Sequence, residues 1–397
     1  MNDLLLNKKI LIGVTGSIAI YKTLELIRLL IKSGATVRVI MSEEAKRFIT
    51  PLTFEAISQN EVLHVQSESW ANDNNHIHIG KWADLFVVAP ITANSINKIS
   101  NGIADNLLLQ TLLAFNKPVI IAPSANTNML LHPSTSQSLK KLQDFGYKIV
   151  DAQNKLLACN DKGIGAMAEP IEIFYNISQS LLLDNFWKNK ELVVTGGGTK
   201  EKIDDVRYIT NNSSGKMAKS ISLAAYYLGA KVTFITTKEA RNLPNEIKII
   251  HTPGSEEMFS ALKSNLKKGA YLFMTAAVSD YTCKEKFSGK LKKSVLGEEF
   301  SLKMVKNRDI LKEIDKTEIK AIGFKAELDK NSAKNSAKNM LIEKNLHAVC
   351  LNILGEQNGF GSDKNEITII KKESEKTLKL DSKLNIAFKI LDELKER

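Results

Sequence analysis

The chain alternates short apolar runs with amphipathic segments over most of its 397 residues. In the first half, runs such as Phe86-Val-Val-Ala89 are apolar at every position, which is typical of parallel strands that are covered on both faces. The segments between these runs have the amphipathic pattern of helices. The predicted strands are Lys9–Val14, Thr36–Met41, Leu85–Ala89, Val119–Ala122 and Lys148–Val150, and the predicted helices are Tyr21–Lys32, Ser42–Phe48, Leu52–Ser58, Asn94–Ile99, Asn106–Ala114 and Pro133–Phe145.

The alternation ends in a helix and a short linker over residues 178–190 and then starts again. This order predicts an α/β protein with two Rossmann-like domains, 1–187 and 188–397, each a mostly parallel sheet flanked by helices. In the second half the predicted strands are Leu192–Thr195, Lys231–Thr236, Ile247–His251, Tyr271–Thr275, Ala321–Phe324, His347–Leu351 and Glu366–Ile370, with Lys364–Leu380 as a terminal hairpin, and the predicted helices are Lys216–Leu228, Ser255–Leu266, Ile310–Ile314, Ser332–Lys344 and Lys383–Lys395.

Each half opens with an apolar strand that runs into a glycine turn and then toward a helix. The first is Ile10–Ile18, and the second contains Leu192-Val-Val-Thr-Gly-Gly-Gly198, whose partner turn is Asn211–Lys216. Bare backbone N–H groups at the start of a helix bind phosphate, so two nucleotide sites are predicted.

Composition excludes several classes of protein. With 43% hydrophobic and 25% charged residues and no run of about 18 apolar residues, the chain is not expected to enter a membrane. The N-terminus lacks the pattern of a signal peptide, and three scattered cysteines are too few for a disulfide framework or a zinc site, so a cytoplasmic location is expected.

The net charge of +11 lies entirely in residues 188–397, since residues 1–187 carry 16 basic and 16 acidic side chains. This asymmetry supports the predicted boundary. A solvated lysine-rich surface explains it, and so does a polyanionic small substrate. No nucleic-acid partner is expected, because no recognised nucleic-acid-binding motif occurs in the sequence.

The first glycine turn differs from a dinucleotide fingerprint. It lacks the third glycine and a suitably placed acid, but it offers the hydroxyl of Ser17 beside a helix start. That combination suits a monophosphate such as that of FMN, and Ser42 offers a second hydroxyl at the next strand end. Each turn alone is equally compatible with a plain strand–turn–helix.

Three later places carry groups that could do chemistry. His76 and His78 lie two residues apart, Asn126 follows an apolar strand, and Cys159 lies in a polar loop between glycines. Paired surface histidines and an inert thiol are the alternatives. The carboxyl ends of strands are where α/β sheets bind ligands, which favours Asn126 as a site residue.

Four motifs together resemble the flavin-dependent phosphopantothenoylcysteine decarboxylase family: Gly16–Lys22, His76–Asp84, Pro123–Met129 and Ala158–Met167. The resemblance implies that His76 is the base, that Asn126 binds the substrate carboxylate and that Cys159 is the acid, with His78 a non-catalytic neighbour. It also implies FMN as cofactor, bound by Gly16, Ser17, Ile18, Ser42 and Thr92.

The implied reaction begins when FMN takes two electrons from the cysteinyl thiol of the substrate. The resulting thioaldehyde accepts the electrons that CO₂ leaves behind, and Cys159 protonates the ene-thiolate. Ala125, Asn160 and Ala166 depart from the family pattern, and Ala166 replaces an arginine. The alternative is therefore an FMN-binding regulatory protein with an impaired decarboxylase half and an active ligase half.

The second half resembles phosphopantothenate–cysteine ligase, which many bacteria fuse behind the decarboxylase. The order of a P-loop is absent, so a P-loop kinase is rejected. The matching segments are Asp204–Met217, Ala276–Tyr281, Lys290–Lys293, Lys303–Leu311, Gly323–Glu327 and Gly359–Glu366.

This resemblance implies that 4′-phosphopantothenate is activated by CTP as an acyl-cytidylate, which the amine of cysteine then attacks. Asn211 is the expected acyl-binding residue, Lys290 the expected charge-neutralising group and Asp280 a nucleotide or Mg²⁺ ligand. Met340 stands where the family has a lysine, and Lys338 is the expected substitute. Homo-oligomers are implied, with trimers of the first domain and dimers of the second. The implied CTP site comprises Asp280, Lys290, Asn307, Arg308, Asp309, Ile310, Leu311, Phe324, Lys338 and Lys344.

Overall fold

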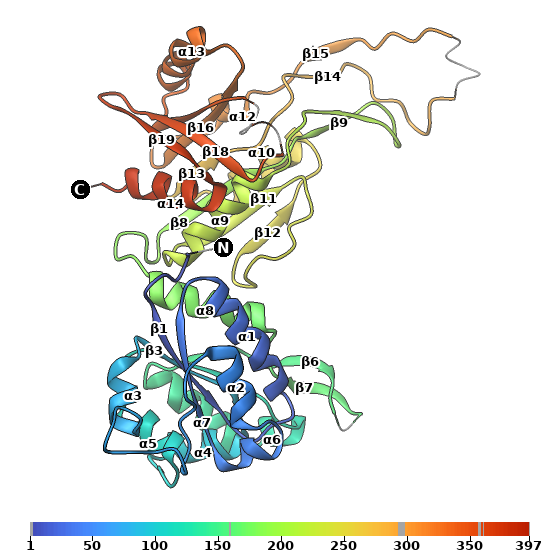
Figure 1. Cartoon of the computed structure of the whole chain (residues 1–397). Coiled ribbons are helices and arrows are strands. Elements are labelled where there is room, and N and C mark those ends of the chain that lie inside the picture. The colour runs from blue at the N-terminus through green and yellow to red at the C-terminus, as the bar shows by residue number, and fades with distance from the viewer. Residues whose placement is uncertain (1–2, 159, 293–297, 356–358, 360, 397) are drawn as a thin grey trace. The chain divides into compact units, whose positions relative to one another are not determined.

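The computed structural model describes residues 3–158, 160–292, 298–355, 359 and 361–396. The chain forms two compact units, Met1–Leu182 and Leu183–Arg397. In Figure 1 the first unit runs from blue to green and the second from green to red. No helix within the described residues has both the length and the apolar character that a membrane span requires.

The first unit is built on a parallel sheet of five strands in the order β2-β1-β3-β4-β5. This is the strand order of flavodoxin-like folds, in which ligands bind where the order reverses, between β1 and β3. The predicted α/β class with a parallel sheet is confirmed. The strands are β1 (Lys9–Val14), β2 (Thr36–Met41), β3 (Leu85–Ile91), β4 (Val119–Pro123) and β5 (Lys148–Ile149).

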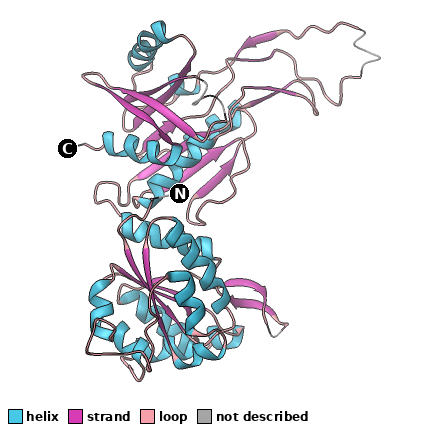
Figure 2. Cartoon of the chain, in the orientation of Figure 1, coloured by secondary structure: helices cyan, strands magenta, loops and turns pink. Residues whose placement is uncertain are grey.

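Helices cover both faces of this sheet (Figure 2). The helices are α1 (Ile20–Lys32), α2 (Pro51–Ser58), α3 (His76–Trp82), α4 (Ala93–Ser100), α5 (Leu107–Ala114), α6 (Thr127–Leu131), α7 (Pro133–Asp144) and α8 (Pro170–Leu182), with a 3₁₀ helix η1 (Glu43–Arg47). Apolar residues of α3, α4, α5 and α7 share one core cluster with alternate residues of β1, β3 and β4, whereas α1 packs against α8.

The first unit contains one antiparallel pair that the sequence pattern did not indicate. Strand β7 (Lys162–Ala166) lies within the segment that was expected to be a loop, and its partner β6 (Gln153–Leu156) precedes that segment. Their residues are mostly polar or glycine and mostly exposed, so the apolar alternation that marks a buried strand is missing here.

The second unit has an eight-stranded sheet in the order β12-β11-β8-β13-β16-β17-β18-β19. The first six strands are parallel and follow the Rossmann order 3-2-1-4-5-6, and the predicted terminal hairpin adds two antiparallel strands at one edge. The strands are β8 (Glu191–Gly196), β11 (Lys231–Thr236), β12 (Lys248–His251), β13 (Tyr271–Met274), β16 (Lys320–Glu327), β17 (Ala348–Ile353), β18 (Lys364–Ile370) and β19 (Glu375–Ser382).

Helices α10, α12 and α13 contribute to one core cluster with this sheet, and α9 packs against α14. Two antiparallel pairs, β9–β10 and β14–β15, were not predicted, because each strand has only three residues. The remaining elements are α9 (Lys216–Tyr227), α10 (Ser255–Asn265), α12 (Ile310–Glu313), α13 (Lys330–Glu343), α14 (Lys383–Glu393), β9 (Lys200–Lys202), β10 (Tyr208–Thr210), β14 (Tyr281–Cys283) and β15 (Met304–Lys306).

Candidate active sites

The first unit has a pocket of about 750 Å³ at the carboxyl ends of β1, β3 and β4. It lies at the reversal point of the strand order, as expected for a flavodoxin-like sheet. Ser17 Oγ lies 3.0 Å from Ser124 Oγ at its wall. The predicted residues that line the pocket are Gly16, Ser17, Ile18, Thr92 and Asn126.

The phosphate-binding character of this pocket comes from the start of α1. The N-cap residue Ala19 has no side chain that could cap the helix, and the first turn contains no acid. Its N–H groups are therefore suited to an anion. Lys22 adds a cation to the same turn, although its Nζ also contacts Glu169 Oε1 at 3.0 Å.

Ser42 is not among the described residues that line the pocket, but it lies close by. A Cβ on Gly16 would be 2.7 Å from Glu44 Cβ, so the glycine turn packs against the segment that begins at Ser42. Ser42 Oγ is buried and has no hydrogen-bond partner within the described part of the chain. A buried hydroxyl without a partner is costly, which is consistent with a bound ligand that supplies one.

The β6–β7 hairpin packs against the loop that carries Asn126. Ala125 N donates to Gly165 O at 3.1 Å, and a Cβ on Gly165 would lie 2.1 Å from Ala125 O. Glycine is therefore required for this close approach. Cys159 falls between the two strands in the sequence and lies outside the described residues.

The hairpin also contributes a cation to the pocket. Ala166, which departs from the family pattern, lines the pocket together with Lys155 and Glu169. Lys155 Nζ forms an ion pair with Glu169, which also binds Lys22. Burial raises the pKa of Glu169, but hydrogen bonds from the two lysines outweigh this effect and hold its pKa below the ordinary value.

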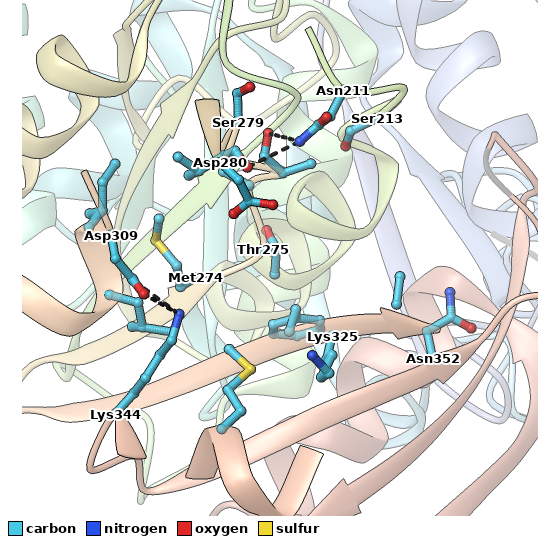
Figure 3. A pocket seen from close by; sticks show the side chains of 18 of the residues that line it. Asn211, Ser213, Met274, Thr275, Ser279, Asp280, Asp309, Lys325, Lys344 and Asn352 are labelled. Carbon is cyan, nitrogen blue, oxygen red and sulfur yellow. Dashed lines mark hydrogen bonds and ion pairs between the residues drawn. The ribbon is translucent and has the colours of Figure 1, made fainter. Parts of the chain in front are cut away.

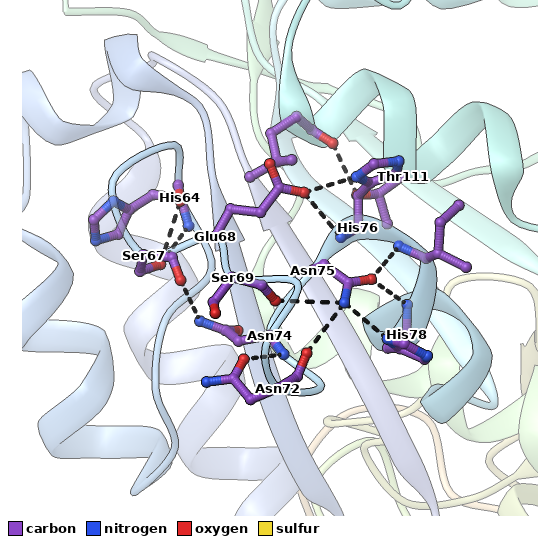
Figure 4. Close-up of polar contacts among 12 residues, drawn as sticks. His64, Ser67, Glu68, Ser69, Asn72, Asn74, Asn75, His76, His78 and Thr111 are labelled. Carbon is purple, nitrogen blue, oxygen red and sulfur yellow. Dashed lines mark hydrogen bonds and ion pairs between the residues drawn. The ribbon is translucent and has the colours of Figure 1, made fainter.

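His76 lies at the first position of α3 (Figure 4). The side chain of Asn75 caps this helix by accepting from Ile77 N and His78 N. His76 Nδ1 is 2.7 Å from Glu68 Oε1, and its ring meets Trp70 edge to face at 5.5 Å. The helix start makes His76 and His78 diverge, so only one of them faces Glu68.

The first unit does not bring His76 to the pocket of Asn126. His76 lines a small separate hollow with Thr111 and Phe115. Figure 1 shows α3 and the β6–β7 hairpin on opposite sides of this unit. The expected pairing of His76 with Asn126 in one site is therefore not formed within a single chain.

The second unit has a pocket of about 500 Å³ at the carboxyl ends of β13, β16 and β17 (Figure 3). Among the described residues, no group of three or more His, Cys, Asp or Glu side chains could hold a metal by itself. The predicted residues that line the pocket are Asn211, Asp280, Asn307, Arg308, Asp309, Ile310, Leu311, Phe324 and Lys344.

Two asparagines shape the floor of this pocket. Asn211 Nδ2 donates to the carbonyls of Ala277 at 3.4 Å and Val278 at 3.1 Å. Asn307 Nδ2 donates to Ser279 O at 2.9 Å, and Asn307 N donates to Asp280 O. These bonds hold the strand-end loop, which carries Asp280, against both turns.

Asp309 and Lys344 form an ion pair at the wall, with Nζ 3.0 Å from Oδ1 and 2.8 Å from Oδ2. Burial raises the pKa of Asp309, but hydrogen bonds from Lys344 and from Lys312 N outweigh it, so the pKa lies below its ordinary value. Asp309 is thus a carboxylate that neutralises Lys344.

Lys290 and Lys338 do not appear among the described residues that line this pocket. Lys338 Nζ lies 3.8 Å from Glu375 Oε2, beside the terminal hairpin. The expected substitution of Lys338 for the missing lysine at Met340 is therefore not seen, because the helix directs position 338 away while Met340 itself lines the pocket. Lys325, which the sequence analysis did not single out, also lines it.

The segment around Lys290 is held by two acids of the 204–207 turn. Gly289 N donates to Asp205 Oδ2 at 2.7 Å, and Leu291 N donates to Asp204 Oδ2 at 3.1 Å. Burial raises the pKa of Asp204, but hydrogen bonds from Val206 N, Leu291 N and Arg207 N outweigh it and leave the pKa below its ordinary value.

The second glycine turn, Gly196–Gly198, is absent from the described lining of the nucleotide-sized pocket. A Cβ on Gly198 would lie 2.3 Å from Asn211 O, and one on Gly197 would lie 2.2 Å from Thr237 Oγ1. Gly198 thus allows the Asn211 turn to pack closely at the end of β8, and Gly197 allows the same close approach by Thr237. A direct phosphate contact of this glycine turn stays a prediction.

Comparison with known proteins covers both units. The model of the flavoprotein family matches residues 2–182, and that of the DNA/pantothenate metabolism flavoprotein C-terminal domain matches residues 187–397. The coenzyme A biosynthesis bifunctional protein CoaBC of Vibrio parahaemolyticus is 37% identical to this chain, and the match covers 99% of each of the two proteins. The protein of the same name from Haemophilus influenzae is also 37% identical, with 98% of each protein covered. The Bacillus subtilis protein of that name is 37% identical over 98% of this chain and 97% of its own.

The chain belongs to the family of coenzyme A biosynthesis bifunctional proteins. The resemblance predicted from the motifs in both halves is thereby confirmed, and the first unit is a flavoprotein domain of this family. The match spans nearly the full length of these family members, so both pockets lie within the part that they share.

Proposed function

We propose that residues 188–397 join 4′-phosphopantothenate to cysteine with CTP, and that residues 1–187 decarboxylate the product to 4′-phosphopantetheine. The observation that carries this proposal is the full-length match to bifunctional proteins of coenzyme A biosynthesis. Each half has its own pocket at the carboxyl ends of a parallel sheet, where such folds bind ligands. The substrates are small phosphorylated molecules of the cytoplasm, where we expect the enzyme to act.

The pocket of the first unit fits FMN. The start of α1 and Ser17 would hold the phosphate, and the buried hydroxyl of Ser42 is available to a ligand. When bound, FMN supplies the two-electron oxidation of the substrate thiol that makes loss of CO₂ possible. Thr92 lines this pocket, and its Oγ1 accepts a hydrogen bond from Ser95 N. Its side chain would contact the cofactor.

The protein residues of the decarboxylase then orient the substrate and move protons. Asn126 would bind the departing carboxylate, Cys159 would protonate the sulfur-stabilised carbanion, and His76 would act as base near the thiol. Because His76 and Asn126 lie apart in one chain, we infer that His76 completes the pocket of a neighbouring copy. A trimer of this domain would bring the two together.

In the ligase half, the carboxylate of 4′-phosphopantothenate would attack the α-phosphorus of CTP and release pyrophosphate. The amine of cysteine would then attack the acyl carbon and release CMP. Asn211 would bind the acyl group, and Lys290 would neutralise charge on the phosphorus. Lys290 can do so only if its own segment, or a second copy in a dimer, brings it to the pocket.

Magnesium would accompany the triphosphate. Mg²⁺ is commonly held by one or two carboxylates and by substrate phosphates, so the absence of a three-carboxylate cluster from the described residues is compatible with it. Asp280 lines the pocket and is the proposed ligand.

A two-step assay tests the proposal. The purified protein is incubated with 4′-phosphopantothenate, cysteine, CTP and Mg²⁺, and the products are followed by mass spectrometry with and without added FMN. We expect the acylcysteine to form first and 4′-phosphopantetheine and CO₂ to follow. Accumulation of the acylcysteine in flavin-loaded protein would favour the regulatory alternative, and turnover with ATP in place of CTP would contradict the nucleotide assignment.

A further inference from the structure

We propose that Lys325 binds the phosphate chain of the nucleotide in the second unit, opposite Lys344. The inference rests on the proposed ligase function and adds a residue to it. Lys325 lies near the carboxyl end of β16 and lines the same pocket as Asp280 and Lys344 (Figure 3). It is 26% exposed, so most of its side chain lies within the protein while the pocket remains within its reach.

The strand geometry places Lys325 beside the uncharged side chain of Met340. Side chains two apart on a strand share a face, so Lys325 and Gly323 face the same way. A Cβ on Gly323 would lie 2.8 Å from Met340 Cε. Met340 of α13 therefore covers the face of β16 from which Lys325 projects, and both residues line the pocket.

Of the other cations that line the pocket, Lys306 lies on β15, and Arg308 and Lys344 are less available to an anion. Arg308 turns toward Glu256 and Glu313, at 3.2 Å each, with its guanidinium 4.2 Å from the centre of the Phe259 ring. Lys344 Nζ contacts both carboxylate oxygens of Asp309. A pocket for a triphosphate needs further positive charge, because several phosphate oxygens must be neutralised away from bulk water.

Lys325 can supply that charge. Its partner is Glu327, whose Oε1 lies 3.3 Å from Nζ, longer than the 2.7–2.9 Å of a strong charge-assisted bond. Glu327 also accepts from Ser336 Oγ, so it keeps a partner when Lys325 turns to a ligand. The lysine can therefore exchange its partner without leaving the half-buried carboxylate of Glu327 unpaired.

The test compares Lys325→Met with Lys334→Met in the full chain. Lys334 lies on α13 and pairs with Glu375 at 2.7 Å, outside the described lining of the pocket, so it controls for loss of one lysine. We expect Lys325→Met to raise KM for CTP about tenfold, as for one lost charge-assisted contact, with KM for cysteine unchanged. Lys334→Met should leave both constants within about twofold, since exposed ion pairs contribute little.

A rescue variant keeps the test decisive. Met340→Lys combined with Lys325→Met places a lysine at the α13 position that covers the same face of β16, and we expect it to bring KM for CTP back to within about threefold of the parent value. Lys325→Arg, which keeps the charge, should remain close to the parent. Circular dichroism of each variant reports whether it folds, and calorimetric binding of CTP alone gives the affinity without turnover.

The outcomes separate this inference from the function on which it rests. If the parent protein neither binds CTP nor releases pyrophosphate, the proposed ligase function fails. If the parent is active but folded Lys325→Met keeps its KM and its affinity for CTP, the role of Lys325 is refuted and the ligase proposal stands. If Lys325→Met does not fold, unchanged CTP affinity in folded Lys325→Gln would refute the role equally.

Discussion

Glu68 Oε1 accepts a hydrogen bond from His76 Nδ1 at 2.7 Å, and His76 N approaches the same oxygen at 3.4 Å. A carboxylate can only accept, so Nδ1 carries the proton and Nε2 is left as the basic nitrogen. Trp70 packs against the ring. Glu68 is thus a positioning residue for His76, fixing both its tautomer and its orientation.

Glu68→Ala should lower kcat for decarboxylation about tenfold while ligase activity stays unchanged, because His76 loses its fixed tautomer. The ¹⁵N chemical shifts of the His76 ring report the tautomer directly and should move in the variant. Asp73→Asn is the matched control, since Asp73 lies 3.9 Å from His78 and is 90% exposed. A loss of activity with unchanged ring shifts would assign Glu68 a structural role only.

Mixing two inactive variants tests whether the decarboxylase site is shared between copies. His76→Asn and Asn126→Ala should each abolish decarboxylation alone. Co-expressed in one cell, they should regain about a quarter of the parent activity, because random assortment restores one intact site in four when the two residues come from different chains. If His76 acts within its own chain, every mixed site lacks one residue, and the mixture stays inactive.

The glycines of the β6–β7 hairpin should tolerate substitution unequally. Gly165→Ala places a Cβ 2.1 Å from the backbone carbonyl of Ala125, which cannot rotate away, so the Asn126 loop must shift. Gly163→Ala instead meets Thr127 Oγ1, the end of a side chain that can turn. We expect decarboxylation to fall at least tenfold in the first and less in the second, with the ligase of each chain as internal control. Equal effects would argue against the contact as the cause.

The sequence predicted the sheets well, because buried parallel strands carry unbroken apolar runs. Val119–Ala122, for example, was expected as a strand and is found as β4 (Val119–Pro123). Polar residues in the loops that follow such strands, among them Asn126 and Asp280, were also found at pockets. The strand ends of a parallel sheet converge at one edge, so order along the chain is enough to place these residues.

Residues on helices and long loops could not be placed in this way. Lys338 and Met340 differ by two positions on α13, yet only Met340 lines the pocket. A rotation of about 200° separates such positions on a helix, and the sequence does not give the helix's orientation. The role of His76 stays a prediction: within one chain it lines a different hollow from Asn126, and the sequence of one chain does not say whether a residue serves a neighbouring copy. Lys325 was missed because a single lysine at a strand end resembles any solvated one.

The acids of the 204–207 turn give a prediction with a defined pH window. Asp204 is 2% exposed and its pKa is held below the ordinary value of about 3.9, so its bonds stabilise the fold fully above that value and are lost as pH falls through the lowered pKa. Asp204→Asn should therefore lower the melting temperature of the second unit by a few degrees from pH 8 to 5, through loss of the contact with Leu291 N. This difference should shrink below about pH 4, because Asp204 is protonated first in the unfolded chain, and it should vanish as the folded parent loses its carboxylate at the lowered pKa. Scanning calorimetry across this range measures it, with Asp315→Asn as control because Asp315 bonds only locally to Thr317 among the described contacts. A difference that persists undiminished at pH 3 would show that the charge of Asp204 is not what holds the Lys290 segment.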